Sequence, residues 1–287
     1  MIRIENLEFR YAAEAPLALC LVDAQIGDGQ YVALIGPNGC GKTTLAKHLN
    51  GLLTPTSGDI WVDGMNTKDS STLRDLRRAV GMVFQNPDNQ IVGMTVEEDL
   101  AFGPGNLRLP AAEIGRRVEE ALRAVGLAGY EKRPTHTLSG GEKRLVAIAG
   151  VLAMRPQYLV FDEPTSFLDP AGKRRILSVI RKLNESGIGI IHITHDMDEI
   201  VESDHVLVMT EGRISMAGSP GEVMSRVEEM KAMGLGPPQV TELMWRLRQS
   251  GQDVQETVLT IDEAVKTISS LILRKSGPGG EGAHSGV

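Results

Sequence analysis

A short glycine-rich segment that directly follows an apolar run constrains this chain more than any other feature. The run, residues 31–35, does not alternate and is typical of a strand buried on both faces. Residues 36–43 then match GxxxxGK followed by Ser or Thr, and Lys42 onward indicates a helix. Strand, loop and helix in this order predict an α/β fold with a nucleoside triphosphate site at one sheet edge.

Composition narrows the possible partners. The 287 residues suit one large α/β domain plus an extension. The formal net charge is −7 and no strong basic stripe is present, which argues against nucleic acid as a partner. No apolar run reaches the ~18 residues that a membrane span needs, so any membrane role would pass through a partner. The only cysteines, Cys20 and Cys40, predict no disulfide framework.

The pattern along the chain predicts an α/β core with a helical insertion. Further strands are expected over residues 2–9, 17–26, 60–62, 79–84, 158–161, 188–193 and 205–209. Residues 88–155 indicate an inserted helical subdomain, because Thr95 and Glu98 form a capping box and apolar residues from 114 to 125 follow a helical period. After Asp169, a helix with Ile176, Leu177, Ile180 and Leu183 toward the core is expected.

The chain changes character near residue 220. We predict a domain over residues 1–220, a helical extension over 221–275 and a flexible, Gly-rich tail over 276–287. In the last helix Ile261, Ala264, Val265, Ile268, Leu271 and Ile272 share one face. That face either packs on the core of the extension, which we favour, or contacts a partner.

The glycine loop should surround phosphate groups with backbone N–H groups at the start of a helix. Lys42 would reach the β and γ phosphates, and the Thr43 hydroxyl would ligate Mg²⁺. Cys40 is either a small residue that fits the loop or a thiol whose pKa the helix lowers. The alternative for the whole segment is a strand-to-helix turn without a ligand.

Two consecutive carboxylates follow a buried strand. Asp162 ends the apolar run from Tyr158, where a charge is costly unless a cation meets it, and Mg²⁺ beside Thr43 is the natural candidate. Glu163 follows at once and is placed to accept a proton from an attacking water. The alternative is an acidic pair at the surface end of a strand.

Three further residues follow predicted strands. Gln85 could contact Mg²⁺ or the water and report on the γ-phosphate, although a loop Gln is often only solvated. His195 lies after residues 188–193, where α/β ligands bind, although a lone His there is often structural. Tyr11 could stack on adenine or simply pack against the sheet.

Ser139, Gly140 and Gly141 form a second candidate anion site at a helix start. The helical insertion should keep this segment away from the glycine loop of its own chain. A second chain, related by a two-fold axis, could supply it, so that two ATP molecules would be buried between the chains.

Taken together, the ordered motifs resemble the nucleotide-binding domain of ATP-binding cassette (ABC) proteins over about residues 1–220. The resemblance implies a P-loop NTPase fold, with a RecA-like core, an antiparallel β subdomain and the helical insertion. It implies Mg²⁺ at Thr43, Gln85 and Asp162, and catalytic roles for Glu163, His195 and Gln85 in ATP hydrolysis. The implied nucleotide ligands are Tyr11, Gly36, Pro37, Asn38, Gly39, Cys40, Gly41, Lys42, Thr43, Thr44, Ser139, Gly140 and Gly141, with Asp169 linking the two sites of a dimer.

Residues 85–90, 101–107 and 236–243 more narrowly resemble the ATPase of energy-coupling factor (ECF) importers. That resemblance implies a translocase subunit, peripheral at the cytoplasmic face of the cell membrane, that energises import of cobalt, nickel or a vitamin. Its implied partners are a second ABC ATPase, identical or related, a transmembrane coupling protein and a substrate-capture membrane protein. No residue of this chain identifies the cargo.

The chain departs from the family pattern at a few positions. Glu142, Lys143, Arg144 and Leu145 follow the Ser-Gly-Gly segment, where Gln usually comes first and Arg often occupies the last position. Phe167 stands where a small residue is usual. The alternatives are the ATPase of another ABC importer, for amino acids or metal, and a non-transport cassette protein that acts on ribosomes or DNA.

Overall fold

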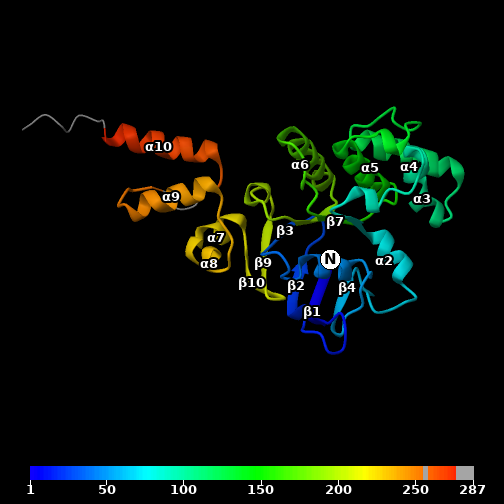
Figure 1. Ribbon diagram of the computed structural model, residues 1–287, viewed down its shortest axis with the longest axis horizontal. Helices are drawn as coiled ribbons and strands as arrows, with labels where there is room; N and C mark the ends of the chain where they lie inside the picture. Colours follow the sequence, from blue (N-terminus) through cyan, green and yellow to red (C-terminus); the bar gives the residue numbers. More distant parts are fainter. Residues whose placement is uncertain (255–257, 276–287) are drawn as a thin grey trace, which may run out of the picture. The chain divides into compact units, whose positions relative to one another are not determined.

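The structure, a computed structural model, describes residues 1–254 and 258–275. The tail predicted for residues 276–287 lies outside these described residues. The chain divides into two compact units, one of residues 1–195 and 203–217 and the other of residues 196–202 and 218 onward. Figure 1 labels the elements of both units. The predicted domain boundary at residue 220 stays a prediction.

A six-stranded sheet, in the order β10-β9-β3-β8-β7-β6, forms the centre of the first unit. Parallel pairs join β9 to β3, β3 to β8, β8 to β7 and β7 to β6. Every residue of β3, β7 and β8 is buried, as their unbroken apolar runs predict. The strands are β3 (Tyr31–Ile35), β6 (Val80–Val83), β7 (Tyr158–Asp162), β8 (Gly189–Ile193), β9 (His205–Thr210) and β10 (Arg213–Gly218).

A second, four-stranded sheet has the order β2-β1-β4-β5, and its pairs are antiparallel. Its strands are β1 (Ile2–Phe9), β2 (Leu19–Ile26), β4 (Ser57–Val62) and β5 (Met65–Asn66). The second strand begins at Leu19 rather than at the predicted residue 17, because its pairing with β1 ends at Phe9 opposite Leu19. The antiparallel subdomain expected from the family resemblance is therefore present.

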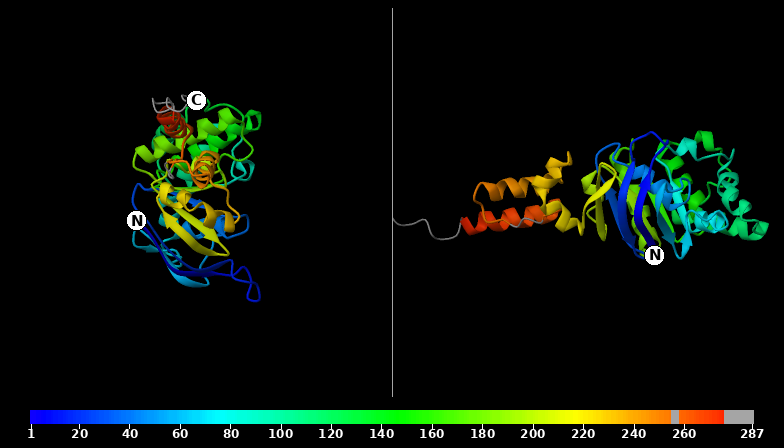
Figure 2. Two further views of the ribbon diagram at one scale, coloured as in Figure 1. Left: turned by 90° about the vertical axis from the view of Figure 1, so that its left-hand side faces the viewer. Right: turned by 90° about the horizontal axis from the view of Figure 1, so that it is seen from below.

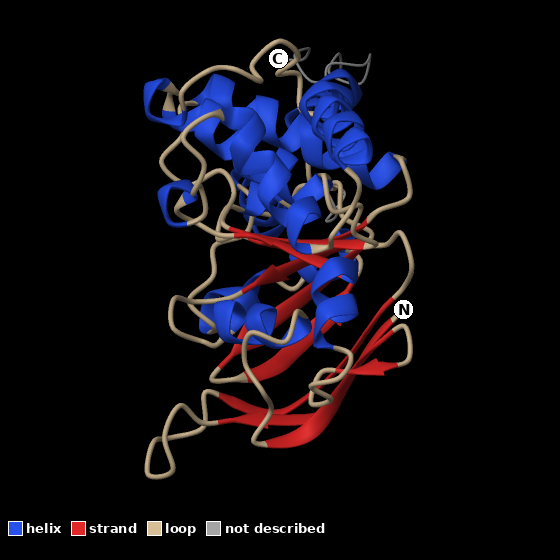
Figure 3. Cartoon of the chain, turned by 90° about the vertical axis from the view of Figure 1, so that its right-hand side faces the viewer, coloured by secondary structure: helices blue, strands red, loops and turns tan. Residues whose placement is uncertain are grey.

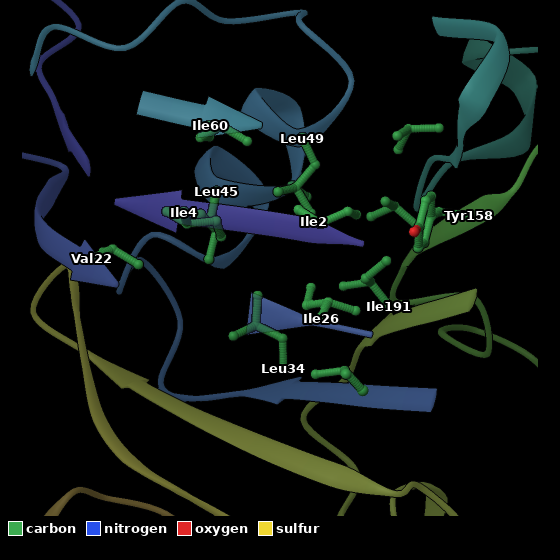
Figure 4. Close-up of a cluster of buried hydrophobic side chains, with 14 of the residues drawn as sticks. Ile2, Ile4, Val22, Ile26, Leu34, Leu45, Leu49, Ile60, Tyr158 and Ile191 are labelled. Carbon is green, nitrogen blue, oxygen red and sulfur yellow. The ribbon is translucent and has the colours of Figure 1, made fainter. Parts of the chain in front are cut away.

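Helix α1 (Lys42–Leu49) contributes to one aliphatic core with both sheets. Figure 3 shows helical turns between the two groups of strands. In Figure 4, Ile2 and Ile4 of β1 and Leu45 and Leu49 of α1 lie in the same cluster as Ile191 of β8. This packing fixes the start of α1, and with it the glycine loop, against the end of β3. Helix α2 (Leu73–Ala79) leads directly into β6.

A group of helices follows β6 in the predicted insertion, namely α3 (Val96–Asn106), α4 (Ala111–Ala124) and α5 (Gly140–Leu152). Capping boxes start α3 at Thr95 and α5 at Ser139. Their apolar faces share a core cluster with β7 and with α6 (Pro170–Glu185). In α6 the buried residue is Val179 rather than the predicted Leu177, because Val179 continues the i, i+3, i+4, i+7 stripe of Ile176. The limits 88 and 155 stay predictions.

The second unit has a small core of its own, formed by Met244, Val254, Val258 and Ala264. Its helices are α7 (Pro220–Ser225), α8 (Val227–Ala232), α9 (Gln239–Gln249) and α10 (Ile261–Lys275), and Figures 1 and 2 show α9 beside α10. Only part of the predicted face of α10 is covered, since Ile261, Val265 and Ile272 stay exposed. These residues stay exposed because the neighbouring helix, α9, covers only a narrow stripe of α10. Among the described residues, no helix has both the length and the apolar character needed to cross a membrane.

The insertion should depend on the burial of α4. Leu122 is fully buried, so Leu122→Ala removes apolar contacts and leaves a cavity. We expect the free energy of unfolding to fall by about 2–4 kcal/mol in urea titrations. Leu52→Ala is the control, because Leu52 is 45% exposed, and it should change the value by less than about 0.5 kcal/mol. Equal midpoints for both variants would contradict the packing of α4.

Candidate functional site

The ends of four parallel strands bring the predicted site residues to one edge of the sheet. Asp162, the last residue of β7, lies opposite Ile193 of β8, and Ile193 lies opposite Leu34 of β3. The glycine loop therefore begins beside the segments that carry Glu163 and His195. In open α/β sheets, this carboxyl edge is where ligands bind.

The glycine loop has a conformation that other residues could not adopt. Gly41 has φ of 109°, and a Cβ there would lie 2.7 Å from the carbonyl oxygen of Ala18. A Cβ at Gly36 would lie 2.1 Å from the carbonyl oxygen of Met209. Lys42 is only 6% exposed, and its Nζ donates to the carbonyls of Gly36 and Pro37 at 2.8 and 2.9 Å. The cation is thus held inside the loop, where phosphates are expected.

Asp162 lies beside the start of α1. The Thr43 hydroxyl donates to both of its carboxylate oxygens, at 3.1 Å and 2.9 Å. Burial raises the pKa of Asp162, the hydrogen bond from Thr43 opposes this effect, and the charge of Glu163 adds to it. A buried carboxylate that meets a hydroxyl is a donor set that suits a hard divalent cation.

Three segments converge on the Glu163 carboxylate. Its Oε2 accepts hydrogen bonds from Gln85 Nε2 at 2.9 Å and from the Ser166 hydroxyl at 2.8 Å. His195 Nδ1 lies 3.3 Å from Oε1. Glu163 itself has φ of 48°, and its N–H donates to the carbonyl of Ile193 at 2.9 Å. The three predicted catalytic residues therefore lie together, and Ser166 joins them.

Tyr11 lies at the side of this site. It is 62% exposed, its ring packs edge-on against Phe9 with centroids 4.9 Å apart, and its hydroxyl shares a 2.9 Å hydrogen bond with Thr44 Oγ1. These contacts leave much of the ring accessible, which is compatible with the predicted stacking on a base. The contact with Phe9 fits the alternative prediction, in which Tyr11 simply packs against the sheet.

A cavity of about 570 Å³ lies between several of these groups, although Asp162 and Ser166 do not line it. Its lining residues are Tyr11, Ala18, Asn38, Gly39, Gly41, Lys42, Thr43, Thr44, Gln85, Glu163 and His195. Gly36, Pro37 and Cys40 belong to the same loop without lining this cavity. The cavity has the size of a small-molecule site, and the lining combines a cation, hydroxyls and one candidate base.

Ser139, Gly140 and Gly141 do not line the cavity. Ser139 caps α5, and its hydroxyl accepts from the N–H of Glu142 at 3.3 Å. Asp169 also lies outside the lining, where it caps α6 by accepting from the N–H of Gly172 at 2.9 Å. The separation of Ser139 from the loop agrees with the expectation that one chain does not close its own site.

Comparison with known proteins identifies the family. A family model described as ABC transporter matches residues 20–166. A cobalt import ATP-binding protein, CbiO, from Syntrophus aciditrophicus is 53% identical over 270 residues, which cover 94% of this chain and 96% of that protein. This chain belongs to the ABC transporter family. The predicted ABC nucleotide-binding fold and ATPase activity are confirmed.

Other similar proteins support the same family assignment. An energy-coupling factor transporter ATP-binding protein, EcfA1, from Caldanaerobacter subterraneus subsp. tengcongensis is 51% identical and covers 93% of this chain and 98% of its own. CbiO1 from Clostridium perfringens, described as part of the ABC transporter complex CbiONQ, has a TM-score of 0.74 at 38% identity, covering 87% and 96% of the two chains. A dimeric cassette bound to ADP and Pi has a TM-score of 0.69 at 28% identity, covering 77% and 99%.

Two of the departures of this ABC cassette from its family pattern, Glu142 and Leu145, have local explanations. Glu142 completes the capping box, accepts from the Tyr130 hydroxyl at 2.8 Å and pairs with Arg133. The hydrogen bond from the backbone N–H of Ser139 is the main reason that the pKa of Glu142 falls to about 2. Leu145 is buried among apolar helices. Phe167 has φ of 65° and is 96% exposed, and nothing among the described residues accounts for its size.

Sequence reasoning missed Ser166 and Ala18 as site residues of the cassette. Ser166 lies in the segment between Glu163 and Asp169, and its hydrogen bond to Glu163 depends on the turn that the chain makes between these two residues. Ala18 lies in the connection that leads into β2, far from the motifs. The N–H of Ala18 donates to the carbonyl of Phe9, the last residue of β1, which lies two residues before Tyr11.

The raised pKa of Asp162 predicts a pH-dependent stability. A raised pKa means that the folded protein binds this proton more readily than the unfolded chain does. The stability that this proton contributes is fully present below the usual pKa of about 4, and it is lost as pH rises through the raised pKa of the folded protein. Asp162→Asn carries no charge, so without nucleotide its melting temperature should rise relative to that of the wild type as pH increases above about 4.

The matched control for this measurement is Asp59→Asn. A hydrogen bond from Asn66 is the main reason that the pKa of Asp59 is lowered, so its contribution is present above the usual value and is lost as pH falls. The melting temperature of this variant should therefore not rise relative to that of the wild type as pH increases. If the difference in melting temperature between Asp162→Asn and the wild type does not change with pH, the burial of this charge is not costly.

Proposed function

We propose that this chain is the ATP-hydrolysing subunit of an ECF-type importer for cobalt, nickel or a vitamin. What supports this is the convergence of Gln85, Ser166 and His195 on Glu163 beside the glycine loop. In addition, two relatives of the chain are named as a cobalt import ATP-binding protein and an energy-coupling factor transporter ATP-binding protein. The chain would lie at the cytoplasmic face of the membrane as a peripheral subunit. Its partners would be a transmembrane coupling protein and a separate substrate-capture membrane protein.

The residue roles follow from the chemistry of the site. Water attacks the γ-phosphorus, Glu163 accepts its proton, and ADP leaves with inorganic phosphate as the second product. Gln85 orients the water, and His195 contacts the γ-phosphate. Lys42 reaches the β and γ phosphates once ATP replaces the carbonyls of its own loop as partners.

The donor set fits Mg²⁺ as the resident cation. Thr43 offers a hydroxyl, Gln85 an amide oxygen and Asp162 a buried carboxylate whose pKa burial raises. These three residues would hold the ion. When bound, Mg²⁺ compensates the charge of the phosphate oxygens. Asp162 and Thr43 are already oriented toward each other by their hydrogen bonds.

The remaining nucleotide contacts would come from both chains of a dimer. The glycine loop, from Gly36 to Thr44, and the Tyr11 ring would bind the nucleotide within one chain. Ser139, Gly140 and Gly141 of a second cassette, identical or related, would contact the same ATP, and Asp169 would link the two sites. This explains why the Ser139 segment caps a helix outside the cavity of its own chain. In this proposal residues 1–220 form the cassette and 221–275 the extension.

Glu163→Gln tests the assigned base. The amide cannot accept the proton, so the rate of phosphate release should fall by about a hundredfold or more. ATP should still bind, so an ATP-dependent dimer should persist in size-exclusion chromatography. Glu185→Gln, an exposed position of α6, is the control and should keep the wild-type rate. Turnover of Glu163→Gln at the wild-type rate would remove Glu163 from this role.

A tagged pull-down from solubilised native membranes tests the ECF assignment. We expect a polytopic coupling protein together with a small membrane capture protein, identified by mass spectrometry. That result would also name the cargo class and show whether a second ATPase is present. Recovery of a two-domain permease with a soluble binding protein would move the chain to another importer class. Recovery of ribosomes instead of membrane proteins would reject a transport role.

A further inference from the structure

The guanidinium of Arg144 is a buried positive charge that faces backbone carbonyls instead of a carboxylate. Arg144 is 3% exposed, and its Nη1 donates to Phe84 O at 2.8 Å and also to Gln85 O. Within the described part of the chain, no acidic side chain pairs with it, and its Nε has no hydrogen-bond partner. Burial lowers its pKa. A buried charge without a counter-ion is costly, so packing alone does not explain this residue.

The two carbonyls that Arg144 contacts lie on either side of the Gln85 Cα. Each carbonyl belongs to a planar peptide, so holding both oxygens fixes the two planes that meet at Gln85. The preceding N–H, that of Phe84, donates to Gln90 Oε1 at 3.1 Å. The direction in which the Gln85 side chain leaves the backbone is thereby set, and its amide donates to Glu163 at 2.9 Å.

Arg144 also belongs to the helix that begins at Ser139. It lies in the first turns of α5 (Gly140–Leu152), so the N-terminus of the helix and the guanidinium move together. The neighbouring Lys143 pairs with Asp88 Oδ1 at 2.6 Å, which ties the same helix to the segment after Gln85. A displacement of α5 is therefore transmitted to the Gln85 backbone.

We propose that Arg144 is a positioning residue that couples the N-terminus of α5 to Glu163 through Gln85. The inference rests on the proposed function, in which ATP held by a second cassette binds at Ser139. Binding there fixes α5, Arg144 then fixes the peptides around Gln85, and the Gln85 amide orients Glu163 and its water. The base of each chain thus becomes sensitive to the nucleotide of the other.

Arg144→Met tests this coupling, because Met keeps an unbranched apolar side chain and removes the hydrogen bonds to both carbonyls. In ATPase assays of the full-length chain we expect kcat to fall by about tenfold to a hundredfold, as for a misplaced catalytic group. The KM for ATP should stay within about twofold, because the glycine loop is untouched. Arg144→Lys should recover part of kcat, since an ammonium can donate to the same carbonyls.

A double-mutant cycle separates positioning from a general structural role. In the Gln85→Ala background, Arg144→Met should cause no further loss of kcat, because its effect passes through Gln85. An equal loss in both backgrounds, with a raised KM and a lower melting temperature, would overturn the proposal. If the Met variant does not fold, Arg144→Lys is compared in the same two backgrounds, and an equal loss there has the same meaning.

Arg123→Met is the matched control, because Arg123 is 65% exposed and pairs with Glu119 on the surface of α4. It should keep the kcat of the wild type. An unchanged kcat in Arg144→Met overturns the coupling and leaves the proposed ATPase site intact. A wild-type chain that releases no phosphate overturns both.

Discussion

The buried carboxylate of Asp162 is the constraint on which the rest of the site depends. Burying its charge within the sheet is costly. Asp162 therefore lies at the end of β7, at the carboxyl edge of the sheet, where a hydroxyl and a cation can contact it. The parallel register places it there by aligning Asp162 with Ile193 and Leu34. A slip of one residue would turn the side chain to the other face of the sheet and separate it from Thr43.

The same register explains how two consecutive carboxylates acquire different partners. Asp162 meets Thr43, whereas Glu163 meets Gln85, Ser166 and His195. The positive φ of Glu163 turns the chain out of the strand, which costs roughly 1 kcal/mol or more for a residue with a side chain. Its hydrogen bond to Ile193 O offsets part of that cost and keeps the turn attached to β8.

Features with a local sequence pattern could be predicted for this chain, whereas several contacts between distant segments could not. The glycine loop, the strand before it and the paired carboxylates follow from short patterns with a steric or electrostatic cause. Ser166 and Arg144 act through contacts that arise only after folding, and Arg144 reaches a carbonyl that is 59 residues away in sequence. Likewise, the apolar period of α10 predicted a face but not how much of it α9 would cover.

Net charge bears on how two such cassettes would meet. Each chain carries a formal charge of −7, so two copies gain nothing from long-range attraction, and salt screens what repulsion remains beyond about 10 Å. In the proposed dimer, attraction would come from groups that face the nucleotide, namely the Lys42 cation and the N-terminal dipoles of α1 and α5. These groups act on a phosphate chain, and their attraction weakens when its terminal group departs. Association of the two cassettes would then depend on the nucleotide state.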